Sequence, residues 1–133
     1  MLTGRCLCGT VRYEMTRAPE VMMYCHCTHC RRASGSSFAT NVIVHRDDFK
    51  ITEGADALGT YESRPGKLRH FCSRCGSPVY NETPGGADWL PVRAGTLDAD
   101  PGIRPQAHIW VKSKTPWFEI RDGLPEHEEW ATD

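Results

Sequence analysis

The chain has 133 residues, of which 39% are hydrophobic and 25% charged, and its formal net charge is -1. These values are typical of a single folded domain, here residues 1–133, and they exclude a disordered chain. They provide no sequence-wide basic field, and no apolar run is long enough to cross a bilayer, so we expect neither nucleic acid nor a membrane as a partner.

The predicted elements are short strands, because apolar or β-branched residues alternate with polar ones along most of the chain. The first residues lack the apolar core of a signal peptide, which predicts a cytoplasmic protein. One helical turn is expected at residues 28–34, where Thr28 can serve as the N-cap. Taken in chain order, the strands are predicted at residues 10–14, 21–24, 38–44, 49–52, 58–61, 68–71, 78–80, 89–94 and 108–111.

The remaining segments are predicted to be turns and loops. Residues 34–37, 83–86 and 98–105 are rich in Ser, Gly, Pro or Asp, which break regular structure. Residues 126–133 form an acidic tail that we expect to be mobile. No stretch has a helical period over 11 residues or more, so the sequence predicts a mainly β domain.

Seven cysteines dominate the chemistry of the sequence. An odd number leaves one unpaired in a disulfide framework, and clustered cysteines in a reducing compartment are more often metal ligands. They fall into three groups along the chain: Cys6 and Cys8; Cys25, Cys27 and Cys30; Cys72 and Cys75.

Two of these groups resemble each other. Cys8 is followed by Gly9 and Cys75 by Gly76, and glycine suits the positive φ that a metal-binding knuckle commonly needs after its second cysteine. Our hypothesis is that the two Gly-terminated pairs share one structural zinc. The central three cysteines then hold a second zinc with one open position, as catalytic sites do.

The alternative is that a histidine closes the second site. His26 and His29 are the candidates, and either would make two inert structural centres. His26 lies between two ligating cysteines, so we expect its side chain to point away from the ion. Arg31 and Arg32 follow Cys30 and either neutralise the thiolates or hold an anionic substrate.

The chain resembles the glutathione-dependent formaldehyde-activating enzyme family, whose domain is shared with centromere protein V. The resemblance is carried by residues 4–14, 25–35, 71–78 and 113–117, which read GRCLCGTVRYE, CHCTHCRRASG, FCSRCGSP and SKTPW. It implies a β-tent (Mss-like) fold of short antiparallel sheets stapled by a structural zinc. It also implies the same division of the cysteines and a condensation of glutathione with formaldehyde to S-hydroxymethylglutathione, which is a carbon–sulfur lyase reaction in reverse.

Glutathione has two carboxylates, so a site for it needs cations. The candidates are Arg31, Arg32, Arg64, Lys67, Arg69 and Lys114. Of these we favour Arg32 and Lys114. Trp110, Trp117 and Phe118 could line such a site, although core packing is the favoured role of each.

Two functions therefore remain open. The first is a zinc lyase that joins or splits a thiol and a small aldehyde, using two zinc ions per chain. The second is a non-catalytic zinc module that binds a protein partner. No residue stands out as a general base, and Ser34 and Ser36 are either hydrogen-bond donors near the ion or turn formers.

Overall fold

The computed structural model describes residues 1–83 and 87–131. The strands are β1 (Leu2–Arg5), β2 (Arg12–Met15), β3 (Val21–Cys25), β4 (Ala39–His45), β5 (Phe49–Glu53), β6 (Leu58–Arg64), β7 (Lys67–Cys72), β8 (Pro78–Glu82), β9 (Trp89–Arg93) and β10 (Ala107–Ile109). The helices are α1 (Thr28–Ser34) and four single-turn 3-10 helices at Arg46–Asp48, Ala55–Ala57, Ala94–Thr96 and Val111–Ser113.

The strands form two sheets. Strands β1, β2 and β5 make a three-stranded antiparallel sheet. The other seven form a second sheet in the order β10-β3-β4-β9-β8-β7-β6, in which only the β10–β3 pair is parallel. The prediction of a mainly β domain is confirmed. No helix within residues 1–83 or 87–131 combines the length and apolar character that a bilayer span requires.

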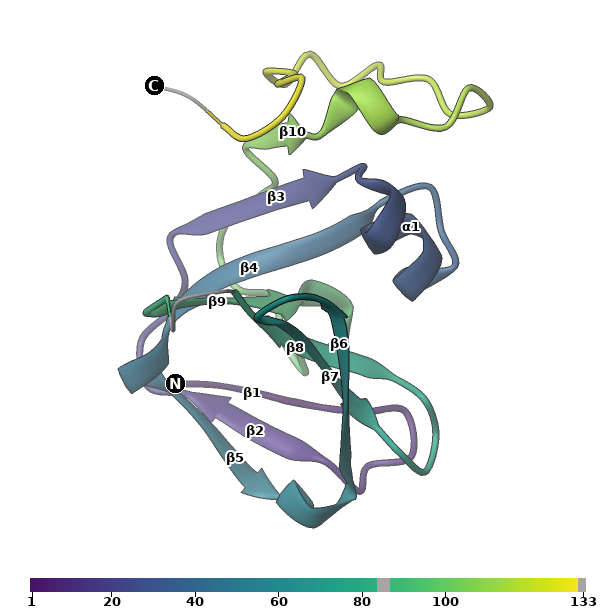
Figure 1. The fold of residues 1–133 in the computed structure, drawn as a ribbon. Helices are drawn as coiled ribbons and strands as arrows, with labels where there is room; N and C mark the ends of the chain where they lie inside the picture. The colour runs from purple at the N-terminus through teal and green to yellow at the C-terminus, as the bar shows by residue number, and fades with distance from the viewer. Residues whose placement is uncertain (84–86, 132–133) are drawn as a thin grey trace.

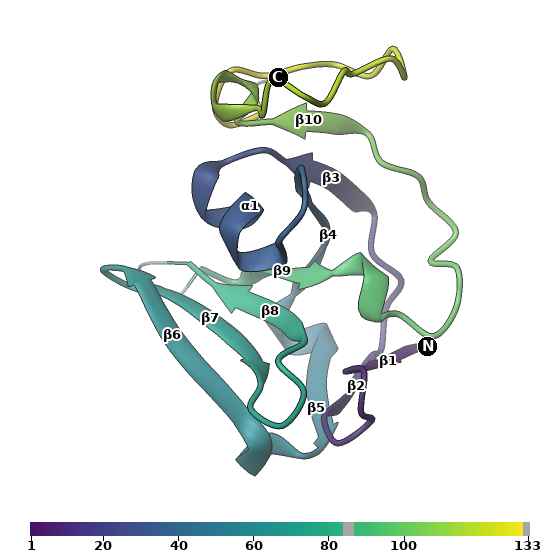
Figure 2. The same cartoon turned by 90° about the vertical axis from the view of Figure 1, so that its right-hand side faces the viewer.

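The two faces of the seven-stranded sheet have different neighbours. The three-stranded sheet lies on one side of strands β8 and β9, and the helix α1 lies on the other (Figures 1 and 2). Adjacent residues of a strand point to opposite faces, so each strand sends one set of side chains toward the small sheet and the other toward α1.

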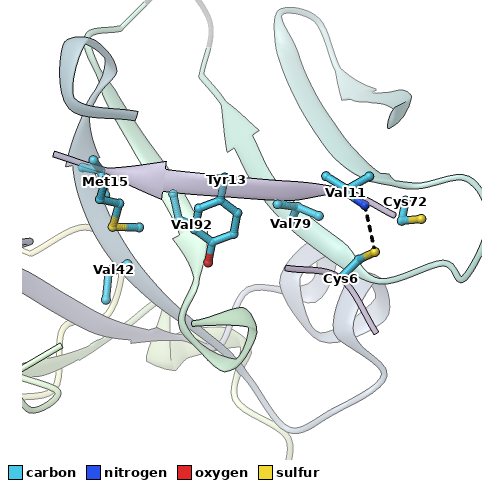
Figure 3. Close-up of a cluster of buried hydrophobic side chains, with 9 residues drawn as sticks. Cys6, Val11, Tyr13, Met15, Val42, Cys72, Val79 and Val92 are labelled. Carbon is cyan, nitrogen blue, oxygen red and sulfur yellow. Dashed lines mark hydrogen bonds between the residues drawn. The ribbon is translucent and has the colours of Figure 1, made fainter. Parts of the chain in front are cut away.

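The main hydrophobic core fills the space between the two sheets. Its largest buried side chains are Tyr13 and Met15 of β2 (Figure 3). The Tyr13 hydroxyl lies 2.7 Å from that of Thr96. The other buried members of this core are Cys6, Val11, Val42, Val44, Cys72, Val79 and Val92. A second, smaller cluster on the α1 side contains Cys25, Cys30, Ala39 and Ile109.

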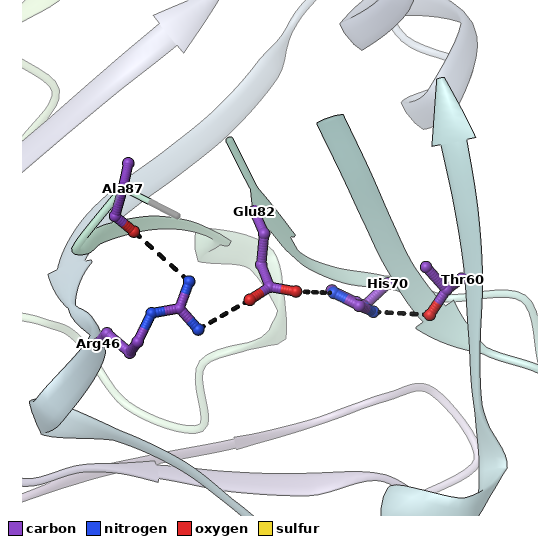
Figure 4. Close-up of polar contacts among 5 residues, drawn as sticks. All are labelled: Arg46, Thr60, His70, Glu82 and Ala87. Atoms are coloured by element: carbon purple, nitrogen blue, oxygen red, sulfur yellow. Dashed lines mark hydrogen bonds and ion pairs between the residues drawn. The ribbon is translucent and has the colours of Figure 1, made fainter. Parts of the chain in front are cut away.

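A polar network joins residues of β6, β7 and β8 to the 3-10 helix at Arg46–Asp48. Glu82 accepts hydrogen bonds from Arg46 at 2.8 Å and His70 at 2.7 Å, and Thr60 lies 2.8 Å from the other ring nitrogen of His70 (Figure 4). Burial raises the pKa of Glu82, but the hydrogen bonds from His70 and Arg46 outweigh it and leave the pKa below its ordinary value of 4.5. The carboxylate is therefore held in its charged form.

Most predicted strands are confirmed to within a few residues, and three differences have clear causes. Strand β1 was missed because its pairing with β2 is not visible in a four-residue stretch. The strand predicted at residues 108–111 ends at Ile109, since Trp110 adopts a left-handed conformation with φ of 58°. Helix α1 has the predicted bounds, but its N-cap is Cys27 rather than Thr28.

The C-terminal segment is attached to the sheet, contrary to the prediction of a mobile tail. The His108 amide donates to the Pro125 carbonyl and the His127 amide to the His108 carbonyl, both at 2.9 Å. The Trp110 and Trp130 rings also meet edge to face with their centroids 5.5 Å apart. The last two residues of the predicted tail, and residues 84–86 of the predicted loop at 83–86, lie outside the described residues.

Candidate metal centres

The first cysteine cluster joins the start of the chain to its middle. Cys6 and Cys8 lie between β1 and β2, Cys72 ends β7, and Cys75 lies in the turn before β8. Their four sulfur atoms all lie within 4.8 Å of one another. The Sγ atoms of Cys6 and Cys8 are 3.6 Å apart, and those of Cys8 and Cys72 are 3.8 Å apart. Zn–S bonds of about 2.3 Å in a tetrahedron give S···S distances of about 3.8 Å, so these four residues fit a zinc ion.

The turns that present these sulfurs use glycine as predicted. Gly9 and Gly76 both have φ of 80°, where a side chain would be strained. Their amides donate to the carbonyls of Cys6 at 3.1 Å and Cys72 at 2.8 Å, which closes each turn. A hydrogen bond with the Ser77 hydroxyl lowers the pKa of Cys75 to about 5, which favours the thiolate that zinc binds.

The second cluster is built where β3 passes into α1. Cys25 ends β3, Cys27 is the N-cap of α1, and Cys30 lies in its first turn. The three sulfurs lie within 4.8 Å of one another, and the Cys27 Sγ accepts a hydrogen bond from the Cys30 amide at 3.2 Å. Gly35, with φ of 65°, ends this short helix. In the second cluster the start of helix α1 therefore presents the sulfur atoms, which the two glycine turns do in the first cluster.

No fourth cysteine, histidine or carboxylate joins the second cluster in the part of the chain that the structure describes. His26 is fully buried, and its Nε2 is hydrogen-bonded to His108 Nδ1 at 2.8 Å, so it points away as predicted. His29 is exposed on α1. A centre closed by three cysteines and a histidine is thus absent from residues 1–83 and 87–131.

Buried cations surround the second cluster. Hydrogen bonds from the Cys25 and Cys27 thiols lower the pKa of Cys30, and the positive charges of Arg93 and Arg69 lower it further. Lys67 and Arg93 are each 7% exposed. Lys67 and Arg69 were among the candidates from the sequence. Arg93 was not, because a single charge at the end of an apolar strand resembles a surface residue.

Lys114 and Arg32, the two cations favoured from the sequence, lie outside this group of buried cations. The Nζ of Lys114 donates to the carbonyls of Thr115 at 3.1 Å and Phe118 at 2.5 Å, so it closes the turn that follows β10. Arg32 is exposed on α1, at the edge of a cavity of about 330 Å³. The cavity is lined by His29, Arg32, Ala33, Tyr61, Ser63 and Arg69. A larger hollow of about 470 Å³, bordered by Glu20, His45 and Trp89, contains neither cysteine cluster.

A chain of polar groups reaches His26 from the C-terminal segment. His108 Nε2 lies 2.8 Å from an Asp122 oxygen and its Nδ1 lies 2.8 Å from His26 Nε2. Since the carboxylate needs a donor, a neutral His108 has its proton on Nε2, and His26 then donates from Nε2. The Nδ1 of His26 is left as a buried acceptor without a hydrogen-bond partner in the described part of the chain. Sequence reasoning missed this chain because its members are up to 96 residues apart.

The aromatic and serine candidates have different environments. Trp110 packs against the second cluster, and its left-handed backbone places strain beside that site. Trp117 is 72% exposed, so core packing is wrong for this residue. Phe118 packs on Phe38 with ring centroids 5.1 Å apart. The Ser34 hydroxyl donates to the Cys30 carbonyl at 2.7 Å and so serves the helix.

Comparisons with known proteins find related sequences. The sequence model of the family described as "Glutathione-dependent formaldehyde-activating enzyme" matches residues 1–113. A Halomonas elongata protein named "Putative glutathione-dependent formaldehyde-activating enzyme" is 31% identical over 129 residues, which cover 90% of this chain and 81% of that protein. A Podospora anserina protein with the same name is 29% identical over 80 residues, 59% of this chain and 38% of its own.

The fold is also similar to that of a protein whose structure has been solved. It is a Rhodobacter sphaeroides protein with a TM-score of 0.62 and 24% identity, and the match covers 77% of this chain and 91% of that one. The family match extends from β1 to the last 3-10 helix and so includes all seven cysteines. The chain therefore belongs to the glutathione-dependent formaldehyde-activating enzyme family.

Proposed function

We propose that the protein is a zinc-dependent carbon–sulfur lyase of the S-(hydroxymethyl)glutathione synthase type. The observation that carries this proposal is the cluster of Cys25, Cys27 and Cys30, which has three sulfur ligands and, in the described residues, no fourth protein ligand. Three protein ligands and an open position are typical of catalytic zinc. The family and the names of the relatives favour glutathione and formaldehyde as the two substrates.

The first cluster has a different proposed role. A zinc ion held by Cys6, Cys8, Cys72 and Cys75 would have a complete tetrahedron and no room for a substrate. Structural zinc contributes about 10–16 kcal/mol of apparent binding free energy at neutral pH, whereas whole domains are stable by about 5–15 kcal/mol. This ion would therefore staple the β1–β2 connection to the end of β7, in a β-tent (Mss-like) arrangement.

The proposed reaction is simple addition. The sulfur of glutathione forms a bond to the carbonyl carbon of formaldehyde, the C=O π bond breaks, and the thiol proton ends on the oxygen. When bound, zinc lowers the pKa of a coordinated thiol and can polarise a carbonyl oxygen. The residues of the chain bring the two reactants together, and holding reactants in a productive geometry can supply a large part of a rate enhancement.

Several of these residues have identifiable tasks. Lys67 and Arg93 put positive charge beside the thiolates and so favour an anionic sulfur. Trp110 covers one side of the cluster and limits the access of water. We place Arg32 at the outer edge, as a contact for a carboxylate of glutathione. The ammonium group of Lys114 already donates to the carbonyls of Thr115 and Phe118, so we give it no substrate contact. A protein that keeps seven thiols reduced suits the cytoplasm, which we propose as its location.

The test must allow for the spontaneous reaction of glutathione with formaldehyde. Exchange between ¹³C-formaldehyde and its glutathione adduct can be followed by NMR exchange spectroscopy on fully zinc-loaded protein. We expect the exchange rate to rise in proportion to the enzyme concentration, and Cys27→Ser to abolish the increase. If zinc-loaded protein leaves the exchange rate at its spontaneous value for glutathione and for other small aldehydes, the chain is instead a non-catalytic zinc module.

A further inference from the structure

Three cations lie on the face of the large sheet that carries the second cysteine cluster. Lys67 and Arg69 are alternate residues of β7, so both point to one face. Arg69 lines the cavity next to α1, which identifies that face. Arg93 pairs with Asn41 of β4, and the alternate residue Ala39 packs against Cys25 and Cys30 in the smaller core.

These cations lack the partners that buried charges normally have. Within residues 1–83 and 87–131, no carboxylate forms an ion pair with Lys67, Arg69 or Arg93. Arg93 donates from one terminal nitrogen to Asn41 at 2.7 Å, and Arg69 donates from Nε to Ser63 at 3.0 Å. Among the residues that the structure describes, the Nε of Arg93 and the Nη1 of Arg69 are buried and have no hydrogen-bond partner. Isolated buried charge costs several kcal/mol, so an anion is expected here.

The thiolates alone do not balance this charge. A zinc ion with three thiolates has a formal charge of about -1, and the three cations exceed it by about two positive charges. The pairing of Arg93 with Asn41 places Arg93 on the strand face where Ala39 packs with Cys25 and Cys30. The surplus donors therefore lie beside the position where a substrate would meet the second cluster.

We propose that Lys67, Arg69 and Arg93 form a carboxylate-binding site next to Cys25, Cys27 and Cys30. The substrate then has a carboxylate within reach of its reacting atom. That carboxylate belongs to either the thiol or the carbonyl compound. A guanidinium is suited to this contact because its parallel N–H groups match the two carboxylate oxygens. The inference rests on the proposed function, because it assigns the orientation of the substrate at the same site.

Thiols of different charge test the inference on cobalt-loaded protein, in which a bound thiol changes the visible spectrum. We expect 3-mercaptopropionate to bind about ten- to a hundredfold more tightly than 2-mercaptoethanol, and cysteamine to bind most weakly. Arg69→Gln and Lys67→Met should each reduce this preference about tenfold. Arg64→Gln removes an exposed cation from the same hairpin and should leave the preference intact.

A second measurement does not depend on thiol binding. Propionate should shift the Nε–H signal of Arg93 in ¹H–¹⁵N spectra, since that donor has no hydrogen-bond partner within residues 1–83 and 87–131. A propionate-induced shift that Arg69→Gln weakens would support the inference. If, in the same protein, no thiol alters the cobalt spectrum, only the proposed function is overturned. If glyoxylate shows the charge-dependent affinity and the thiols do not, the carboxylate belongs to the carbonyl substrate. Equal affinities for all three thiols, with Nε–H signals that propionate and glyoxylate leave unmoved, would overturn the inference.

Discussion

The two cysteine clusters use the same side chain in opposite surroundings. The first cluster lies at the end of the main apolar core, where Cys6 and Cys72 pack among valines and two glycine turns present the sulfurs. The second lies on the α1 face, next to unpaired cations and a strained Trp110. A site that only holds a fold together can satisfy all its groups internally. A site that binds a substrate must leave some of them unsatisfied.

The largest expected effect comes from breaking the first cluster. Cys72 is fully buried, so Cys72→Ser should remove the structural zinc and destabilise the fold by more than about 5 kcal/mol, which approaches the stability of a whole domain. Urea denaturation followed by circular dichroism, together with the zinc content of the purified protein, measures the loss. A Cys72→Ser protein that unfolds at the wild-type urea concentration would show that the two clusters do not differ in this way.

Breaking the second cluster should give the complementary result. Cys27→Ser removes a ligand that is half-buried at the start of α1. We expect one zinc per chain to remain and the urea midpoint to stay close to that of the wild type. The enzyme-dependent part of the exchange of formaldehyde with its glutathione adduct should fall by about a hundredfold or more. Loss of cooperative unfolding in this variant would mean that the second cluster is structural too.

The Glu82 network supplies a reference for an ordinary buried polar contact outside both clusters. Glu82→Gln should cost about 1–3 kcal/mol at pH 7, because Arg46 and His70 lose a charged acceptor. The folded-state pKa of Glu82 is lowered, so its contribution is fully present above the ordinary value of 4.5 and is lost as the pH falls through the lower folded value. Urea midpoints of the two proteins should therefore converge at acidic pH.

The exposed Glu20 provides the control for that experiment, since Glu20→Gln removes a carboxylate that accepts no hydrogen bond through its side chain in the described residues. We expect its urea midpoint to follow the wild type at every pH. If the difference in urea midpoint between Glu82→Gln and the wild type stays constant down to pH 3, the pKa of Glu82 is not lowered.

The smallest effect compares two glycines. Gly76 and Gly35 have φ of 80° and 65°, and an added Cβ would meet no atom within 4 Å at either position. Alanine should therefore cost about 1–2 kcal/mol at each, from backbone strain alone. Only Gly76→Ala should also weaken zinc binding by the first cluster, about tenfold in competition with a chelator. Equal zinc affinities of the two variants would show that the glycine turn at Gly76 does not contribute to zinc binding.

The sequence was sufficient for the parts of the molecule that local chemistry determines. Alternation predicted nearly all strands, and the residues after Cys8 and Cys75 predicted the two positive-φ turns and the sharing of four cysteines. Arg93 and the contact of His26 with His108 were missed because they depend on which strands become neighbours. Trp110 was assigned to a strand, since nothing in an apolar aromatic side chain indicates a left-handed backbone.

The attachment of the C-terminal segment has a consequence for solubility. β10 is the outermost strand at one end of the large sheet, and the segment around residues 125–129 occupies its free hydrogen-bonding side. The family model matches residues 1–113, so this cover lies beyond the matched residues. A chain shortened to residue 124 would expose an unpaired edge, which is a template for sheet extension between molecules. Aggregation, rather than loss of either cysteine cluster, is the expected result of that truncation.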